Sequence, residues 1–364
     1  MSDEFLMQMR PWFGEEEKKA ICDYMDEDGF LTEYKNTSYF EKLIASFTGV
    51  KHCVVVNNGT ISLTLAAMAA GIKSGDEVIV PNYTMVATPN SLKLFGAKPV
   101  FVDVEADTLC LDIDLVRKAI TSKTKAVILV SANGRYPSSG ISSFEQLCSD
   151  KKITLIEDAA QSLGSSYSDG RHIGSAGAVG SFSFSAPKII STGQGGALIT
   201  NSDEINSKLR HLKDFGRAQG GNDIHDTIGF NFKFTELQAC IGIAQMDKLD
   251  FRVERKKEIY SQYQNELRNL DEVRFFNQDL KSTTPWFIDI LVDNRNDLQQ
   301  FLKDNGIGSR PMYPPINSQK AYNFNGSFPV SSNVGQNGLW LPSMSQISND
   351  EITKVTNTIK DFFK

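Results

Sequence analysis

The chain has 364 residues, of which 40% are hydrophobic, 23% are charged and 10% are aromatic. This composition is typical of a globular protein and excludes collagen-like, coiled-coil and extensively disordered chains. The formal net charge of −6, from 38 basic and 44 acidic residues, argues against nucleic-acid binding through a basic surface. We therefore expect a globular protein of about two domains, since domains average roughly 150 residues, with no nucleic-acid partner.

Cysteines and histidines are few and widely spaced. The chain has five cysteines, at Cys22, Cys53, Cys110, Cys148 and Cys240. Neither they nor the four histidines form a disulfide or metal-ligand pattern, so we expect no metal. The N-terminal segment is acidic, unlike a signal peptide, and no apolar run reaches the roughly 20 residues of a membrane span. These features predict a cytoplasmic protein without a membrane partner.

Short apolar runs alternate with helical stretches through the first half of the chain. The first 45 or so residues are expected to be helical, because apolar side chains such as Phe40, Ile44 and Phe47 recur at helical spacing. Nearly all-apolar runs follow at 53–56, 77–80, 99–102, 126–130 and 153–156. Such runs are typical of parallel strands buried on both faces, and the stretches between them suit crossover helices. The fold class is therefore α/β with a mostly parallel central sheet.

The remaining elements predict a second, smaller domain. Two runs at 180–185 and 196–201 are too close for a crossover helix between them, so at least one is expected to be antiparallel. A long helical stretch then begins near residue 235. A strand and two helices are expected after it, at 285–292, 297–305 and 350–363. We interpret 1–249 as a large domain that includes the N-terminal helical segment, and 250–364 as a small α+β domain.

Residues able to bind a phosphorylated aldehyde follow the predicted strands. Ligands of parallel α/β sheets bind beyond the carboxyl ends of the strands. There, the segment Asn58-Gly59-Thr60 is expected to begin a helix. It can bind an anion through free backbone N–H groups, or it can simply cap the helix. Asp158 can pair with a protonated ring nitrogen or cap the following helix. Lys188 can form a Schiff base or lie in a solvated loop. With Ser183, they make up the set that pyridoxal phosphate requires. The glycines at 193–196 precede a strand and do not form a dinucleotide fingerprint.

The chain resembles the DegT/DnrJ/StrS family of fold-type-I, pyridoxal-phosphate-dependent nucleotide-sugar aminotransferases, including perosamine-synthase-like enzymes. The resemblance extends from about residue 10 to 360. The segments that carry it keep their order along the chain: 58–60, 75–81, 156–161, 181–188, 193–196, 228–233 and 341–343. The resemblance implies an α/β large domain that binds pyridoxal 5'-phosphate and a smaller C-terminal domain.

The resemblance also implies a role for individual residues. In the family, the lysine that matches Lys188 binds the cofactor covalently and moves the proton, and the acid that matches Asp158 pairs with the ring nitrogen. Gln161 matches the side chain that hydrogen-bonds the ring hydroxyl. The phosphate ligands of the family match Gly59, Thr60 and Ser183. Asn231 matches a residue that reaches the cofactor phosphate of the neighbouring subunit, which implies a homodimer with active sites at the interface.

Three positions near the expected sugar pocket depart from the family pattern. Met85 stands where the family commonly has an aromatic ring stacked on the cofactor; a thioether can also contact a ring face, and Tyr83 is an alternative aromatic group. The segment 131–134 reads Ser-Ala-Asn-Gly instead of His-Leu-Tyr-Gly, and Asn317 replaces a frequent histidine. These departures bear on the substrate and not on the cofactor.

Other polar side chains are candidates for substrate binding. Arg217 and Arg310 suit a diphosphate or a carboxylate, because a guanidinium binds such groups bidentately; an ordinary surface ion pair is the alternative for each. His225 precedes the Asn231 segment, and a surface loop is its alternative position. Tyr83 and Tyr313 complete the candidate substrate set.

We expect an aminotransferase that moves an amino group from glutamate to a nucleotide-linked keto-sugar, with a 4-keto-6-deoxyhexose favoured. Its product would serve amino-sugar and surface-polysaccharide biosynthesis, such as that of lipopolysaccharide O-antigen. Alternatives are a 3-keto-sugar aminotransferase, a related sugar dehydratase, a non-catalytic cofactor-binding regulator and a dinucleotide oxidoreductase. Lys188 argues against the dehydratase branch, which has histidine there. The sequence leaves open the nucleotide, the aminated carbon, the pathway and any assembly beyond a dimer.

Overall fold

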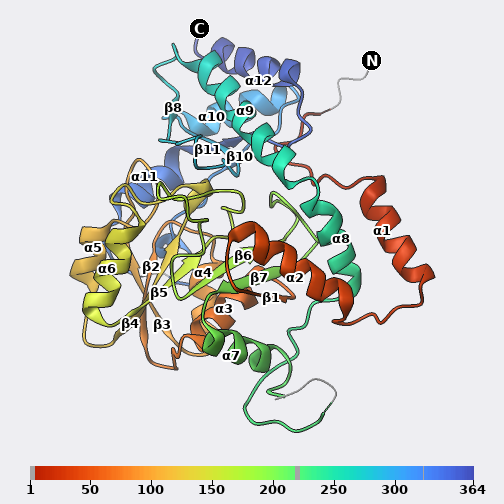
Figure 1. Ribbon diagram of the computed structural model, residues 1–364. Coiled ribbons are helices and arrows are strands. Elements are labelled where there is room, and N and C mark those ends of the chain that lie inside the picture. The colour runs from red at the N-terminus through yellow and green to blue at the C-terminus, as the bar shows by residue number, and fades with distance from the viewer. Residues whose placement is uncertain (1–4, 218–221, 323) are drawn as a thin grey trace.

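A seven-stranded, mostly parallel sheet forms the larger part of the molecule (Figure 1). The computed structural model describes residues 5–217, 222–322 and 324–364. The order of the strands across the sheet is β1-β7-β6-β5-β4-β2-β3. Their bounds are β1 His52–Val56, β2 Glu77–Pro81, β3 Lys98–Val102, β4 Thr124–Val130, β5 Thr154–Asp158, β6 Val179–Ser183 and β7 Gly196–Thr200. β7 is antiparallel to β6 and β1, whereas the other pairs are parallel. The predicted α/β class and the antiparallel strand are confirmed.

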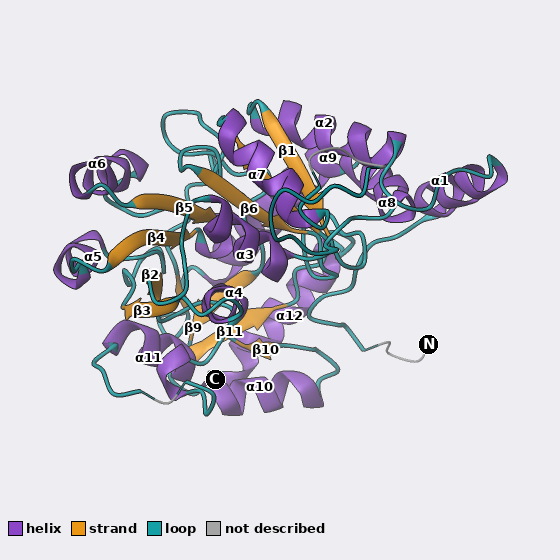
Figure 2. Cartoon of the chain, turned by 90° about the horizontal axis from the view of Figure 1, so that it is seen from below, coloured by secondary structure: helices purple, strands orange, loops and turns teal. Residues whose placement is uncertain are grey.

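Helices cover both faces of this sheet, because successive strand residues point to opposite sides. Val54 and Val56 of β1 pack in one apolar cluster with residues of α3, α4 and α7, and Cys53 and Val55 pack in another with residues of α2, α5, α6 and α8. Figure 2 shows α3 and α4 on one side of the strands. The bounds are α2 Lys35–Thr48, α3 Gly59–Ala69, α4 Ala87–Lys93, α5 Ile113–Ala119, α6 Ile141–Lys151, α7 Asp203–Lys213 and α8 Glu236–Met246; α1, Glu15–Asp26, packs beside α8.

A second, antiparallel sheet carries its own apolar core. Its strand order is β10-β11-β9-β8, and Figure 1 shows it with α9, α10 and α12 above the larger sheet. The core includes Tyr263 of α9, Ile290 of β9 and Ile359 of α12. The bounds are β8 Arg274–Phe275, β9 Ile288–Leu291, β10 Arg310–Pro311, β11 Gly338–Leu341, α9 Leu249–Leu267, α10 Arg295–Asp304, α11 Pro329–Asn337 and α12 Asn349–Phe362.

The helical stretch expected from residue 235 onward is two helices and not one. α8 ends at Met246, and α9 begins at Leu249 in a different direction (Figure 1). The break follows from packing: Leu249 and Val253 belong to the core of the first sheet, whereas Ile259 and Tyr263 belong to that of the second. α9 therefore connects the two cores.

The two cores meet in a shared aromatic cluster. Tyr83 and Ala132 of the first part pack there with Trp286, Phe287 and Trp340 of the second. Polar contacts accompany it: Arg135 and Asp289 form a buried ion pair of 2.7 Å. At the beginning of the chain, Leu6 bridges to Ile307 and packs in the second core. A division at 249/250 stays a prediction, because the N-terminal segment contacts the second sheet.

Within the described residues, the helices are all too short or too polar to cross a lipid bilayer. The same part of the chain contains no group of three or more histidine, cysteine or acidic side chains placed to hold a metal ion.

Candidate active site

A cavity of about 670 Å³ lies beyond the carboxyl ends of the parallel strands, where sequence reasoning places the site. It opens between the first sheet and β10, and residues of both parts of the molecule line it. Nine of the predicted site residues are on its wall: Gly59, Thr60, Met85, Asp158, Gln161, Ser183, Lys188, Arg310 and Tyr313. The folded chain therefore brings together residues from five separate segments.

The N-terminus of α3 forms one end of the cavity. Asn58 caps the helix: its side-chain oxygen accepts a hydrogen bond of 2.9 Å from the Ile61 N–H. The first N–H groups of a helix have no acceptor within it and favour an anion. A Cβ added at Gly59 would lie 2.7 Å from Cβ of Ser183, so glycine lets the helix end approach the Ser183 hydroxyl. Ser185 lies beside it, with the two oxygens 3.3 Å apart. This cluster of donors suits a phosphate.

Asp158 is a buried carboxylate that forms no close ion pair within the described residues, although the charge of Lys188 acts on it from a distance. It ends β5, and only 6% of its surface is exposed. One oxygen accepts a hydrogen bond of 2.8 Å from the Thr88 hydroxyl, and the other accepts a longer one from the Ala160 N–H. Burial raises the pKa of this carboxyl, and the Thr88 hydrogen bond opposes that rise. Because Asp158 forms no ion pair with any described residue, a cationic ligand atom would complete its surroundings.

Lys188 provides the amine of the site. It follows β6 in a tight turn, in which its N–H donates to the Ser185 carbonyl at 3.0 Å. Nζ lies 4.2 Å from the centroid of the Trp286 ring. Shielding from solvent lowers the pKa of Lys188 to about 8, and the charge of Asp158 opposes the shift. Near neutral pH, a larger fraction of this amine than of an ordinary lysine is therefore neutral, and hence nucleophilic.

Gln161 is oriented by its neighbours. Its side-chain oxygen accepts a hydrogen bond of 2.6 Å from the Asn133 N–H, so its NH₂ group is left to donate elsewhere. Asn133 has a left-handed backbone (φ 55°), and its side chain exchanges two hydrogen bonds with the backbone of Phe287. Sequence reasoning expects Asn133 near the sugar pocket. Its side chain instead connects the two parts of the chain, away from the cavity wall.

Asn317 also lies off the cavity wall. It exchanges hydrogen bonds of 2.9 and 3.0 Å with the side chain of Asn82. The pair joins the end of β2 to the segment after β10. At this position, where the family frequently has a histidine, the asparagine therefore joins two segments of the chain and does not line the cavity.

The rim of the cavity combines an apolar side with a cationic one. Met85 is 45% exposed and lines the cavity after β2. Arg310, from β10, also lines the cavity; it is exposed, lies 5.6 Å from the Trp340 ring and forms no ion pair with the described residues. Burial raises the pKa of Tyr313, beside it, to about 12, so its hydroxyl stays protonated. The rim thus offers a cation and a hydroxyl to a polar substrate.

Four predicted site residues are absent from this cavity. Tyr83 is buried behind Tyr313, with ring centroids 6.2 Å apart, so it is a core residue and not a substrate contact. The sequence does not reveal which side a residue faces once its strand has ended.

The other three lie in or after the loop that follows α7. Arg217 forms an ion pair of 3.1 Å with Asp223, which is the alternative to substrate binding given for this residue. His225 is exposed in the same loop and contacts the Phe215 carbonyl at 2.8 Å. Asn231 is exposed opposite Asp214.

Other residues on or behind the cavity wall are not predicted from the sequence. Thr88 orients Asp158, and Thr84 contacts Thr88 at 2.9 Å. The Thr84–Thr88 spacing of four, directly after a strand, is a usable signal for one helical turn with two hydroxyls on one side. Gln194 and Trp286 also line the cavity. Trp286 gives no local signal, because only the tertiary fold brings it to Lys188.

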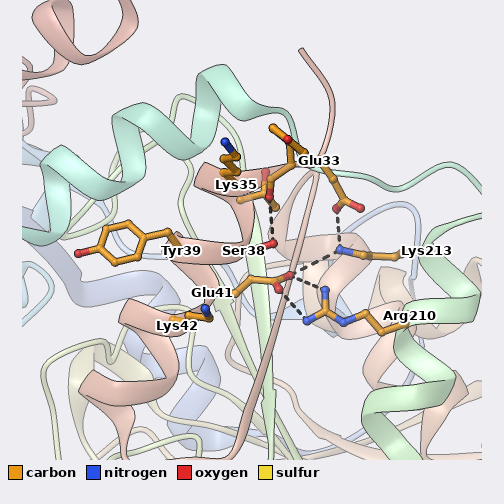
Figure 3. Close-up of a pocket in the computed structure, with 10 residues that line it drawn as sticks. Glu33, Lys35, Ser38, Tyr39, Glu41, Lys42, Arg210 and Lys213 are labelled. Atoms are coloured by element: carbon orange, nitrogen blue, oxygen red, sulfur yellow. Dashed lines mark hydrogen bonds and ion pairs between the residues drawn. The ribbon is translucent and has the colours of Figure 1, made fainter. Parts of the chain in front are cut away.

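A second cavity, of about 600 Å³, lies between α2 and α7 (Figure 3). Its buried charges are neutralised within the chain. Arg210 forms two hydrogen bonds with Glu41, and Lys213 pairs with Glu33 at 2.6 Å. Glu33 also accepts from the Phe234 N–H. This ion-pair cluster of Glu33, Glu41, Arg210 and Lys213 therefore fixes the segment that carries Asn231, and it lacks a free buried group for chemistry.

Comparison with known proteins identifies the relatives of this chain. Residues 12–360 match the model of the DegT/DnrJ/EryC1/StrS aminotransferase family. A GDP-perosamine synthase of Vibrio cholerae is 35% identical over 355 residues, which cover 95% of this chain and 96% of that protein. The crystal structure of S. venezuelae DesV has a TM-score of 0.90 at 30% identity and covers 96% of this chain and 94% of its own. DesI, solved with its TDP-sugar product, has a TM-score of 0.90 at 27% identity, with 99% and 93% covered.

Proposed function

Since the chain belongs to the DegT/DnrJ/EryC1/StrS aminotransferase family, we propose that it transfers an amino group from glutamate to a nucleotide-linked keto-sugar with bound pyridoxal phosphate. One observation carries the proposal: a buried carboxylate without a close ion pair among the described residues, Asp158, shares a cavity with a shielded amine, Lys188. Asp158 can pair with a protonated ring nitrogen, and Lys188 can bond to an aldehyde; a pyridine aldehyde carries both groups. The anion-binding end of α3 lies on the same wall.

The residues present fit the cofactor. The N–H groups of Gly59 and Thr60, with the Ser183 hydroxyl, would hold its phosphate, and the NH₂ of Gln161 would donate to its ring hydroxyl. Asp158 would keep a proton on the ring nitrogen, because a buried carboxylate favours a cation beside it. When bound, pyridoxal phosphate supplies an aldehyde that carries the amino group and a ring that takes up the electrons of the broken C–H bond.

Lys188 would act twice in each half of the reaction. With a pKa of about 8, its Nζ is neutral often enough to bond to the aldehyde carbon near neutral pH. Once the amino donor displaces it, Nζ is an amine held next to the reacting carbon, where it can accept a proton and deliver it. In the half-reaction with the keto-sugar, the same atom would move the proton in reverse.

The rim supports a nucleotide-sugar substrate. The exposed guanidinium of Arg310 suits a diphosphate or the carboxylate of glutamate, because its planar fork binds either bidentately. Met85 offers an apolar surface that suits the methyl group of a 6-deoxy sugar. We favour a 4-keto-6-deoxyhexose, since the similar Vibrio cholerae protein is a GDP-perosamine synthase. The product would then serve O-antigen or another surface polysaccharide. The free state of the five cysteines supports a cytoplasmic location.

A homodimer would complete the site. Asn231 is exposed and does not reach the cavity of its own chain, which supports a role at the cofactor phosphate of a partner. Exposed apolar side chains surround this segment: Phe30 is 69% and Ile228 is 79% exposed. The 28–35 loop lies against it, because the Leu31 carbonyl accepts from the Glu236 N–H. Apolar surface of this kind marks protein interfaces.

The test compares the visible spectra of the native protein and of Lys188→Ala after addition of pyridoxal phosphate. The native protein should develop an absorption band that glutamate removes and a suitable keto-sugar restores. The alanine variant should lack the band. Equal bands in both proteins would refute the assignment of Lys188. A panel of 3-keto and 4-keto nucleotide sugars then identifies the aminated carbon; loss of a hydroxyl would indicate a dehydratase, and no turnover at all would indicate a regulator.

A further inference from the structure

The indole ring of Trp286 contacts Lys188 from the second part of the chain. Nζ of Lys188 lies 4.2 Å from the ring centroid, within the range of a cation–π interaction. The indole N–H donates a hydrogen bond of 2.7 Å to the carbonyl of Pro187, the preceding residue. One side chain therefore holds both the backbone and the amine of the lysine turn.

Trp286 is itself fixed on several sides. Its ring stacks on Phe287 at 3.9 Å and meets the edge of Trp340 at 5.7 Å. Its carbonyl accepts a hydrogen bond of 2.8 Å from Nζ of Lys256, a buried amine that also donates to the Ser343 carbonyl. Only 5% of the Trp286 surface is exposed. The indole is therefore held in one position. Its rotation would break the hydrogen bond to Pro187, the stacking on Phe287 and the contact with Lys188.

This arrangement matters for a lysine that alternates between bonded and free states. A free lysine side chain has four rotatable bonds and loses much entropy when it is held in place. An aromatic face attracts the ammonium form of lysine, and this attraction does not depend on rotation about the Cε–Nζ bond. The ring can therefore hold the group in place while its protons stay free to rotate. It also replaces part of the solvation that the cation loses on burial.

We propose that Trp286 is a positioning residue for Lys188, whose ring face holds the released ammonium group while its N–H fixes the Pro187 carbonyl, so that the amine returns to the same place after each transfer. The proposal rests on the proposed function, because only a lysine that is released needs such a holder. A purely structural tryptophan in the shared aromatic cluster is the alternative that the experiment must exclude.

The charge state of Lys188 in the cofactor-free protein is the first readout. The titratable groups that share its surroundings lie on the cavity wall and behind the turn: Asp158, Arg310, Tyr313, Arg10, Arg252 and Lys256. None of them is altered in the variants Trp286→Phe and Trp286→Leu. Trp340→Leu is the matched control, since it removes a buried indole that contacts Trp286, Arg310 and Tyr313 but not Lys188, and so reproduces the disturbance of the cluster without loss of the ring over the amine.

The pKa of Lys188 is measured from the pH dependence of its labelling by trinitrobenzenesulfonate, which reacts with the neutral amine, with the labelled peptide quantified by mass spectrometry. Trp286→Leu should lower this pKa by about one unit, a tenfold change in the ammonium population. Trp286→Phe should lower it less, because a ring face remains. Trp340→Leu should leave it unchanged. A native value in both Trp286 variants, or an equal shift in Trp340→Leu, would overturn the proposal. If the leucine variant does not fold, the phenylalanine variant decides.

Turnover of the loaded protein is the second readout. Trp286→Phe should lower kcat about tenfold while KM for glutamate stays near native, because the ring acts on the lysine and not on the donor. A change confined to KM would contradict a positioning role. Failure of the proposed function is distinguishable: the native protein would then form no cofactor band that depends on Lys188, whatever the labelling result.

Discussion

Replacement of Asp158 by asparagine should make the cofactor-free protein more stable and the loaded enzyme far slower. The carboxylate is 6% exposed, accepts two hydrogen bonds and forms no close ion pair within the described residues. Burial raises its pKa above that of the unfolded chain, so the native state binds more protons above pH 3.8 and this group makes stability fall as the pH rises. Asparagine keeps the shape and an acceptor oxygen, and removes the buried charge. We expect a gain of about 1 kcal/mol at neutral pH.

The effect on activity has the opposite sign. A neutral amide cannot hold a proton on the ring nitrogen, and loss of one member of a buried charge pair costs about 3–5 kcal/mol. At 1.36 kcal/mol per decade, that is a loss of roughly 10²–10⁴ in kcat. Urea denaturation of the cofactor-free protein and single-turnover kinetics with glutamate measure the two halves of the prediction.

Glu157→Gln is the matched control, one residue earlier on the same strand. Glu157 is also buried, but it accepts hydrogen bonds from the N–H groups of Gly174, Ala176 and Gly177. Glutamine would place an NH₂ group against some of these donors, so this variant should lose about 1–3 kcal/mol of stability while the folded fraction keeps its kcat. The reasoning would be refuted if Asp158→Asn destabilised the cofactor-free protein or kept native turnover.

Three other changes test separate parts of the structure. Gly59→Ala should weaken cofactor binding at least tenfold in equilibrium dialysis, since its Cβ would lie 2.7 Å from Cβ of Ser183 and widen the phosphate cradle; native affinity would show that the cradle tolerates a methyl group. Burial lowers the pKa of Lys256 from 10.5 to about 7, so the unfolded chain binds more protons between these values and stability should rise with pH across that window. Lys256→Met should remove most of that rise, of order 5 kcal/mol, in urea denaturation at several pH values; an unchanged slope would assign the effect to other groups. Lys213→Met leaves Glu33 and Glu41 short of a buried cation; it should cost about 3 kcal/mol and, by loosening the Asn231 segment, weaken the proposed homodimer in sedimentation, whereas Lys208→Met, at an exposed pair on the same helix, should change neither.

The large sheet and the positions of its chemistry could be predicted because both depend on local pattern. Strands such as β4, apolar on both faces, have a single place in an α/β fold. Asp158 and Lys188 follow strands whose carboxyl ends share one edge, so their proximity follows from topology. The end of α8 at Met246 could not be predicted, because the pattern stays helical and only the change of core breaks it.

The errors and omissions concern contacts between distant segments. Tyr83 was a reasonable substrate contact from its place after β2, but its ring turns into the shared aromatic cluster. Asn133 and Asn317 depart from the family pattern, yet both lie off the cavity wall. The Asn133 side chain donates to the Phe287 carbonyl, and the Asn317 side-chain oxygen accepts a hydrogen bond from Asn82. Trp286 reaches Lys188 across 98 positions of sequence, and no local spacing encodes such a pair.

The contact of Asn133 with Phe287 has a consequence for recombination between relatives. Gln161 takes its orientation from the Asn133 N–H, and Asn133 takes its own from the backbone of Phe287. A chimera that receives 250–364 from another family member would keep the proposed phosphate donors Gly59, Thr60 and Ser183. The backbone at position 287 would, however, come from the other protein and could follow a different course. The orientation of the Gln161 side chain, which faces the cavity, would then change with it. Exchange of the second part of the chain therefore requires residues 133 and 287 to be chosen together.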